Sequence, residues 1–327
     1  MKVLVVGGAG YIGSHMVKRL LNEGHAVVTL DDLSSGYRDA VLGGEFVRGS
    51  LADYAGLNAL FEAHRFDGVM HFASFIQVGE SVENPAKYYQ NNVVNTLNLL
   101  NVMVAHNVGR FIFSSSAAIY GQPQYVPIDE AHPKAPINPY GVSKWMVEQI
   151  LADYDRAYAL KSICLRYFNA AGADPDGQLG ERHTPETHLI PLVLQAASGR
   201  RSSISVFGQD YDTPDGTCIR DYVHVTDLCQ AHLLALHHLW SGQGSDAFNL
   251  GNGHGFSIRE VIDVAARVTG RDISITLGSR RSGDPAVLVA DATRAANILG
   301  WVPVFGALES IIQHAWLWEL TENAISQ

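Results

Sequence analysis

Three side chains in this sequence have the right types to move a proton. Tyr140 and Lys144 are four residues apart, and Ser116 ends a run of three serines. Residues at this spacing share one face of a helix. A free phenol, with a pKa of about 10, is a poor base at neutral pH, but a nearby lysine or a positively charged nicotinamide favours the phenolate. The spacing predicts Tyr140 as an acid/base, with Ser116 orienting a substrate hydroxyl.

A glycine-rich segment predicts a dinucleotide site. Gly7, Gly10 and Gly13 lie in GGAGYIG, between an expected first strand and an expected first helix. The first glycine permits a tight turn, the second lets the backbone approach a pyrophosphate, and the third lets helix and strand pack closely. Asp31 ends the expected second strand, where a carboxylate accepts hydrogen bonds from an adenosine ribose and repels a 2′-phosphate. The pattern favours NAD over NADP.

Alternating strand and helix patterns surround these residues. Apolar strands are expected at Lys2–Val6, Ala26–Leu30, Phe46–Arg48, Gly68–Phe72, Arg110–Ser114 and Ser162–Arg166. Helices are expected at Ile12–Gly24, 55–64, 85–106 and Val142–Ala159. This repetition predicts an α/β fold of the Rossmann type, a doubly wound parallel sheet with a smaller mixed α/β C-terminal domain.

The character of the chain changes after Asn169. Gly, Pro, Asp and Thr crowd residues 172–188 and 208–217, and the chain is expected to return to the sheet around Tyr222–Leu239. We therefore expect an NAD-binding domain from residues 1–169 plus about 221–250. A substrate domain is expected from about 170–220 plus 251–327.

Composition excludes several classes of partner. The net charge is −10 with no basic run, which argues against nucleic acid. No apolar stretch approaches the length of a membrane span, and no signal peptide is recognised. The three cysteines have no C-x-x-C spacing and are expected to be reduced thiols in a cytoplasmic protein. No metal site is predicted, because the spacing of four histidines does not close one: His224, His232, His237 and His238.

Several motifs resemble the extended short-chain dehydrogenase/reductase family over nearly the whole chain. They are GGAGYIGSH, HFASFIQVGES, YYQNNV, FSSSAAIYG, NPYGVSK, RYFNAAGA, DGTCIRDYVHV, FNLGNG and RRSGDPA. Within the family they are most similar to enzymes that epimerise UDP-hexoses at C4. Relatives that dehydrate nucleotide sugars usually carry Thr-Asp-Glu after the strand serine, whereas this chain has Ser116-Ala117-Ala118. The missing carboxylates argue against dehydration.

The resemblance implies a role for each matching residue. The implied catalytic residues are Tyr140, Lys144 and Ser116. The implied cofactor contacts are Gly7, Gly10, Tyr11, Ile12, Gly13, Asp31, Asp32, Ser50, Leu51, Phe72, Ala73, Ser74, Asn91, Ser114, Tyr140, Lys144 and Tyr167. The implied contacts to the sugar and to UDP are Ser116, Phe168, Asn169, His188, Leu189, Phe207, Arg220, Arg281, Asp284 and Leu288.

Three positions depart from the family pattern. Many relatives have Asp where this chain has Ser50, so the adenine contact is left to Ser50, to Asp53 or to the backbone of Leu51. Some relatives have Lys where this chain has Ile76, which removes one cationic contact. Leu288 is intermediate in size at a position where a small residue makes room for a 2-acetamido group, so a preference for non-acetylated sugars is only weakly favoured.

The function implied by the resemblance is interconversion of UDP-glucose and UDP-galactose through a 4-keto sugar, in galactose metabolism, with tightly bound NAD regenerated in each cycle. Two alternatives remain open: epimerisation of another UDP-sugar, N-acetylated or uronic, and a non-catalytic NAD sensor. The intact set of Ser116, Tyr140 and Lys144 argues against the sensor. A homodimer is also implied, formed through the helices near 85–106 and 142–159.

Overall fold

The computed structural model describes residues 1–281 and 283–325. Its centre is a seven-stranded sheet in which every neighbouring pair is parallel. The order is β11-β6-β5-β4-β1-β2-β3. The strands are β1 (Lys2–Val6), β2 (Ala26–Asp31), β3 (Glu45–Arg48), β4 (Gly68–His71), β5 (Arg110–Ser116), β6 (Lys161–Tyr167) and β11 (Asp246–Leu250). The predicted doubly wound sheet is confirmed, and its order reverses between β1 and β4, where such folds bind ligands.

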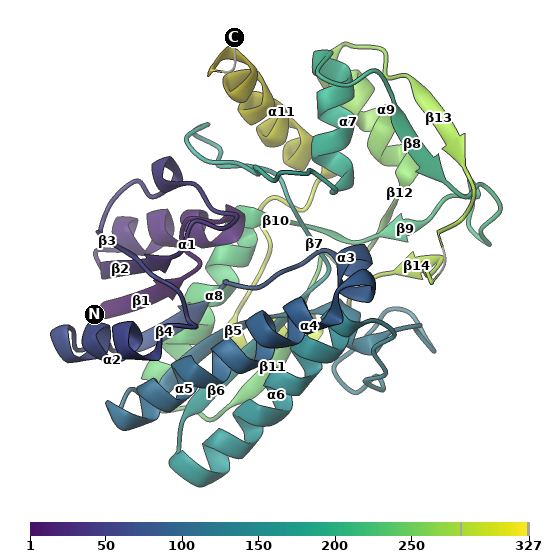
Figure 1. Cartoon of the computed structure of the whole chain (residues 1–327). Helices are drawn as coiled ribbons and strands as arrows, with labels where there is room; N and C mark the ends of the chain where they lie inside the picture. The colour runs from purple at the N-terminus through teal and green to yellow at the C-terminus, as the bar shows by residue number, and fades with distance from the viewer. Residues whose placement is uncertain (282, 326–327) are drawn as a thin grey trace.

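Helices cover both faces of this sheet (Figure 1). One apolar core includes side chains from α1 (Tyr11–Asn22), α8 (Val225–Trp240) and α10 (Thr293–Leu299). The core on the opposite face includes side chains from α2 (Tyr54–Ala63), α5 (Asn95–Ala105) and α6 (Pro139–Tyr158). Because both faces are buried, the central strands are nearly uninterrupted apolar runs, as the sequence indicated.

A second lobe, drawn at the upper right of Figure 1, has its own apolar core. Its helices are α7 (Leu189–Ser198), α9 (Ile258–Thr269) and α11 (Leu308–Ile325). Its strands form small sheets, β12-β9-β14 and β13-β8, and the pair β10-β7 lies between the lobes in Figure 1. Their bounds are β7 (Asn169–Ala171), β8 (Ile204–Phe207), β9 (Ile219–Arg220), β10 (Tyr222–His224), β12 (Phe256–Ser257), β13 (Ile275–Gly278) and β14 (Val287–Leu288).

Short helices complete the chain. They are η1 (Arg38–Ala40), α3 (Val78–Glu83), α4 (Pro85–Tyr88), η2 (Tyr89–Val94) and η3 (Ala117–Tyr120). The helix expected over 85–106 is present as the continuous run of α4, η2 and α5, but η2 within it is π-helical. There Asn92 turns inward and its side-chain amide bonds the backbone of Phe75 and the hydroxyl of Ser143. π-Helical turns are frequent at functional sites.

Two further expectations need correction. The helix expected at Val142 begins at Pro139, because Asn138 caps it by accepting a hydrogen bond from the Gly141 N–H. The chain returns to the main sheet around Tyr222–Leu239 as expected, but it does so through helix α8 and not through a strand. Residues 222–224 form β10, which pairs with β7 in a separate two-stranded sheet, and the main sheet gains β11 instead.

The two-domain division of the sequence stays a prediction. Ala295, Leu299 and Trp301 pack in the core of the NAD-binding sheet, although the predicted boundary assigns them to the substrate domain. Within the described residues, no helix combines the length and the apolar character that crossing a membrane requires.

Candidate functional site

The three predicted catalytic residues converge at the carboxyl edge of the sheet. Ser116 is the last residue of β5, and Tyr140 and Lys144 lie in the first two turns of α6. Gly141 permits this approach, because a Cβ there would lie 2.5 Å from the Ala118 carbonyl oxygen in η3. The start of α6 is therefore packed directly against the segment that follows Ser116.

Lys144 is fixed by two hydrogen bonds. Its ammonium donates to the Ser74 hydroxyl and to the Ser114 carbonyl, each at 2.8 Å. Its Nζ lies 5.9 Å from the centre of the Tyr140 ring. Burial lowers the pKa of Lys144 to about 7, with the charge of Glu148 opposing the shift. Lys144 is thus a buried amine held in place near the phenol.

Tyr140 is partly buried. Desolvation raises its pKa above the usual value, while a hydrogen bond with Ser116 acts in the opposite direction. The sequence suggested that Lys144 or a nicotinamide cation would favour the phenolate. In the structure the pKa of Tyr140 stays raised. A positive nicotinamide beside the phenol would favour the phenolate.

A buried ion pair behind the site was missed by the sequence analysis. Glu148 accepts a 2.5 Å hydrogen bond from Ser115, next to Ser116, and pairs with Arg166 at 2.5 Å. Arg166 also donates to the Tyr120 hydroxyl. Glu148 follows Lys144 at i+4, on the face of α6 that already carries the tyrosine and the lysine, and this spacing was the available signal. The pair holds the end of β5 against α6 and β6.

The glycine-rich loop fits a dinucleotide. Gly7 has a φ of +78°, and a Cβ on it would lie 2.5 Å from the Ala73 nitrogen. A Cβ on Gly13 would overlap the Gly7 carbonyl oxygen, so glycine at position 13 lets helix α1 pack closely against the loop. Gly10 caps α1 without a side-chain hydrogen bond, which leaves the first N–H groups of the helix for an anion.

Asp31 has a structural role in addition to the predicted ribose contact. Its carboxylate accepts hydrogen bonds from the backbone N–H of Ala9, in the glycine-rich loop, and of Leu33. Burial raises its pKa, and these two bonds lower it. Asp32 is exposed and accepts from the Ser34 N–H. An acid at the end of β2 therefore orders the same loop that would receive the diphosphate.

The other predicted cofactor contacts follow the same edge of the sheet. Phe72, Ala73 and Ser74 come directly after β4, and Ser114 and Tyr167 lie at the ends of β5 and β6. Asn91 lies in η2 and its amide contacts Asn92. Ile12 is the second residue of α1. Tyr11 is directed elsewhere, because its hydroxyl donates to the Gly172 carbonyl across to the second lobe.

The groups predicted to contact the adenine, at Ser50, Leu51 and Asp53, already take part in local hydrogen bonds. The carboxylate of Asp53 caps helix α2 through the Gly56 N–H, and the Leu51 carbonyl accepts from Asn98. The Ser50 hydroxyl oxygen accepts from the Ala52 N–H, which leaves its proton free to donate. Ser50 and the backbone of Leu51 remain predicted contacts.

The predicted UDP-binding residues form pairs that hold one another. The Arg281 guanidinium lies 4.1 Å from the centre of the Phe207 ring, and Arg220 lies 3.8 Å from the Asp284 carboxylate. Leu288 is opposite Arg220 in the β14–β9 pairing. Stacked or paired guanidinium groups of this kind are suited to a diphosphate.

The predicted sugar contacts lie at the end of β6. Phe168 and Leu288 pack against the apolar cluster of Ala117, Ile119, Tyr120 and Ile128, directly after Ser116. The Asn169 amide donates to the Asp221 carbonyl. Leu288 and Ser116 thus border the same apolar cluster.

His188, another predicted substrate contact, lies in the loop before α7 and is bonded to an acidic side chain. It precedes Leu189, the first residue of α7, and its Nδ1 hydrogen-bonds the Glu181 carboxylate. His183 and Glu186 lie beside this pair. The sequence analysis did not connect these four residues.

Replacing Gly141 with Ala tests the packing of α6 on η3. The added methyl group would push against the Ala118 carbonyl and displace Tyr140 from Ser116, and a displacement of about 1 Å costs roughly 10²-fold in rate. We expect kcat to fall by about that factor, with the dinucleotide still bound. Gly244→Ala is the matched control, because no atom lies within 4 Å of its added methyl group. Equal rates for the two variants would contradict the interpretation.

The chain is similar to known proteins over almost its full length. Residues 3–251 match the NAD dependent epimerase/dehydratase family. A UDP-glucose 4-epimerase from Halalkalibacterium halodurans is 51% identical over 318 residues, 97% of this chain and 95% of the relative.

Solved structures of such enzymes also resemble this chain over nearly its full length. The UDP-glucose 4-epimerase from Brucella ovis in complex with NAD superimposes with a TM-score of 0.95 at 51% identity, covering 96% of this chain and 97% of that one. The UDP-Glc/GlcNAc 4-epimerase from Campylobacter jejuni superimposes with a TM-score of 0.86 at 46% identity, covering 98% and 99%.

Proposed function

The chain belongs to the NAD-dependent epimerase/dehydratase family, and from that premise we propose that it interconverts UDP-glucose and UDP-galactose through a 4-keto sugar. It is an enzyme, and NAD is its cofactor. The observation that carries the proposal is the meeting of Ser116, Tyr140 and Lys144 at the carboxyl edge of the sheet that carries the glycine-rich loop.

The proposed site residues divide the work as follows. NAD, when bound, supplies the acceptor and donor of the hydride at sugar C4. Ser116 hydrogen-bonds and orients the 4-hydroxyl, while Tyr140 takes its proton and, after the 4-keto sugar has turned over, returns a proton to the 4-oxygen. Lys144, held by Ser74 and the Ser114 carbonyl, keeps a positive charge near the phenol. Ala117 and Ala118 offer no carboxylate for loss of water.

We propose that the enzyme binds the UDP part of the substrate tightly and the hexose only loosely. Arg220 and Arg281 would bind the diphosphate, and Asp284 would position Arg220. The hexose must turn over between its two hydride transfers, so it needs few directional contacts while UDP stays anchored. The apolar surroundings of Phe168 and Leu288 suit that requirement.

The proposal is tested with purified protein and no added NAD. UDP-Gal, UDP-GalNAc and UDP-GalA are incubated separately and the products separated by chromatography. We expect epimerisation of UDP-Gal, with slower turnover of UDP-GalNAc because Leu288 fills space that a 2-acetamido group needs. Faster turnover of UDP-GalNAc or UDP-GalA would support the alternative substrates, and product from none would overturn the epimerase assignment.

We also propose a homodimer. The exposed apolar side chains Val94 and Met146, 42% and 40% accessible, lie on η2 and α6, two helices that pack together. Helices of this kind pair readily across a two-fold axis. Sedimentation equilibrium should give twice the mass of the 35.5 kDa chain.

A cytoplasmic location is proposed from the cysteines. Cys164, Cys218 and Cys229 are all buried and free. Unpaired thiols are typical of reducing compartments.

A further inference from the structure

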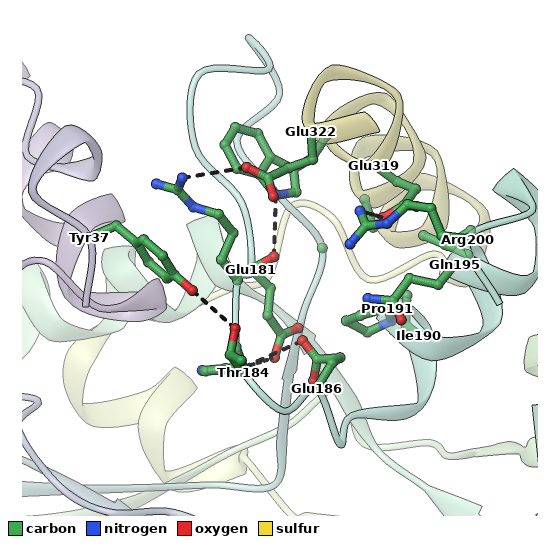
Figure 2. Close-up of a pocket in the computed structure, with 16 residues that line it drawn as sticks. Tyr37, Glu181, Thr184, Glu186, Ile190, Pro191, Gln195, Arg200, Glu319 and Glu322 are labelled. Carbon is green, nitrogen blue, oxygen red and sulfur yellow. Dashed lines mark hydrogen bonds and ion pairs between the residues drawn. The ribbon is translucent and has the colours of Figure 1, made fainter. Parts of the chain in front are cut away.

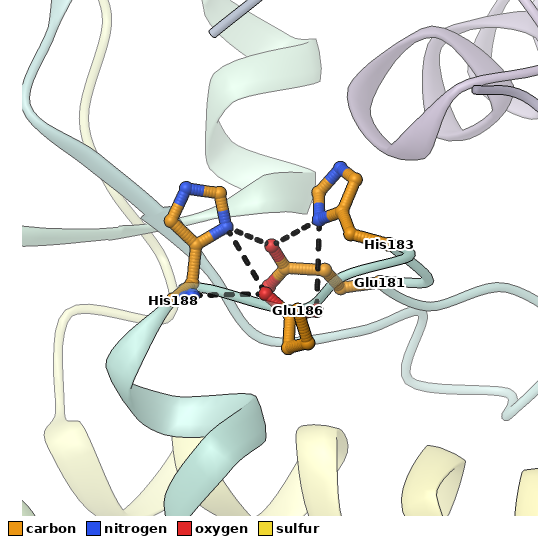
Figure 3. Close-up of side chains that lie close together, drawn as sticks. All are labelled: Glu181, His183, Glu186 and His188. Atoms are coloured by element: carbon orange, nitrogen blue, oxygen red, sulfur yellow. Dashed lines mark hydrogen bonds and ion pairs between the residues drawn. The ribbon is translucent and has the colours of Figure 1, made fainter. Parts of the chain in front are cut away.

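The loop between β7 and α7 brings four potential metal ligands together. Figure 3 shows the imidazoles of His183 and His188 directed at the carboxylates of Glu181 and Glu186. The ligand atoms of all four residues lie within 4.8 Å of one another. We propose that Glu181, His183, Glu186 and His188 form a binding site for one divalent transition cation of the Zn²⁺ class.

The distances suit a four-coordinate cation. The Nδ1 of His183 lies 3.1 Å from a Glu181 oxygen and 3.6 Å from a Glu186 oxygen. The Nδ1 of His188 lies 3.7 Å from a Glu186 oxygen and hydrogen-bonds Glu181. Zinc bonds nitrogen and carboxylate oxygen at about 2.0–2.2 Å in a tetrahedron, which separates neighbouring ligand atoms by roughly 3.3–3.6 Å. A cation can therefore enter with small side-chain movements.

The charge of the cluster also calls for a cation. The side chains of Glu181 and Glu186 are only 4% and 6% exposed. Two buried carboxylates require two compensating positive charges. Arg182 pairs with Asp39 and Glu322 instead. Protonation of both histidines, or one divalent cation bound to neutral imidazoles, meets the requirement.

The geometry of His183 favours the cation. Its Nδ1 is buried and lies 3.1 Å from a Glu181 oxygen, but the two atoms do not form a hydrogen bond of standard geometry. A protonated Nδ1 would thus carry a buried N–H without an acceptor in line, which is costly. A cation shared with the carboxylates uses the nitrogen lone pair instead.

The cluster is accessible from a pocket of about 240 Å³, shown in Figure 2. Glu181, His183 and Glu186 line it, together with Tyr37 of the first lobe. His188 and Leu189, at the other end of the cluster, are predicted UDP contacts. A bound cation would fix this segment; that consequence rests on the proposed function, whereas cation binding itself does not.

The test measures metal binding by the full-length, tag-free protein after chelation and dialysis. Isothermal titration with Zn²⁺ is expected to give one site per chain. Addition of Co²⁺ is expected to produce the visible absorption of a four-coordinate complex. His183→Gln and Glu186→Gln should each weaken Zn²⁺ binding at least 10-fold. His64→Gln is the matched control, because His64 pairs with a single glutamate, Glu45, and should leave binding unchanged.

Two results would overturn the proposal: no Zn²⁺ uptake by the folded wild-type chain, or unchanged uptake in both variants. Circular dichroism checks that each variant is folded. If one variant does not fold, the wild-type titration and the other variant still test whether the cluster binds Zn²⁺. Binding is measured without UDP-sugar, so epimerisation without zinc binding would overturn this site only. Zinc binding without epimerisation would overturn the proposed function only.

Discussion

Replacement of Tyr140 by Phe is expected to leave NAD bound and to reduce kcat for UDP-Gal epimerisation by about 10³-fold, within the range that positioned acid/base groups contribute. The substitution keeps the partly buried aromatic ring and removes only the hydroxyl that hydrogen-bonds Ser116. Ser116 and Lys144 keep their places, because Lys144 is held by Ser74 and the Ser114 carbonyl rather than by the phenol.

Turnover is measured by product chromatography, and bound NAD by absorbance after the protein is denatured. Tyr125→Phe is the matched control, since its exposed hydroxyl bonds only Asp129 among the described contacts and lies in a loop of the surface. Near-normal turnover in Tyr140→Phe would remove the proposed acid/base and leave the hydride transfer without a proton acceptor.

The second large effect is expected from Gly13→Ala. Its new methyl group would overlap the Gly7 carbonyl oxygen and lie 2.9 Å from the Gly8 Cα, both of them backbone atoms that cannot rotate away. Loop and helix would separate, and the N–H groups at the start of α1 would no longer face the diphosphate. We expect purified protein with less than about one-tenth of the NAD content of wild type, since phosphate contacts at a helix N-terminus supply much of the affinity.

NAD content is measured as a molar ratio to protein, and folding is checked by circular dichroism. Gly109→Ala is the control, because its nearest atom, the Ala159 carbonyl oxygen, is 3.9 Å away. Full NAD content in a folded Gly13→Ala protein would contradict the assigned role of the loop. Loss of NAD in both variants would indicate general instability.

Much of the site could be predicted because its residues either follow strands of the parallel sheet or repeat along one helix face. The carboxyl ends of parallel strands meet at one edge of a sheet, so recognising β1, β2, β4, β5 and β6 in the sequence already brings their following residues together. Tyr140 and Lys144 required only the repeat of a helix. The glycine spacing identified Gly13, and its steric reason is visible only in the structure.

Local sequence signals could not predict backbone conformation where that conformation depends on hydrogen bonds from a polar side chain to distant residues. The π-helical turn at Asn92 depends on its bonds to Phe75 and Ser143, which lie 17 and 51 residues away. The start of α6 could have been recognised from Asn138 and Pro139, a cap and a first-turn proline.

The sequence by itself therefore determined the parallel sheet, the dinucleotide loop and the proton-transfer residues, because apolar periodicity and glycine spacing are local. Only the tertiary structure decided that Glu148 would pair with Arg166, and that two glutamates and two histidines of one irregular loop would face one another. Irregular loops have no repeat from which a direction can be read. Their side chains are oriented by burial and charge, which appear only when the lobes pack together.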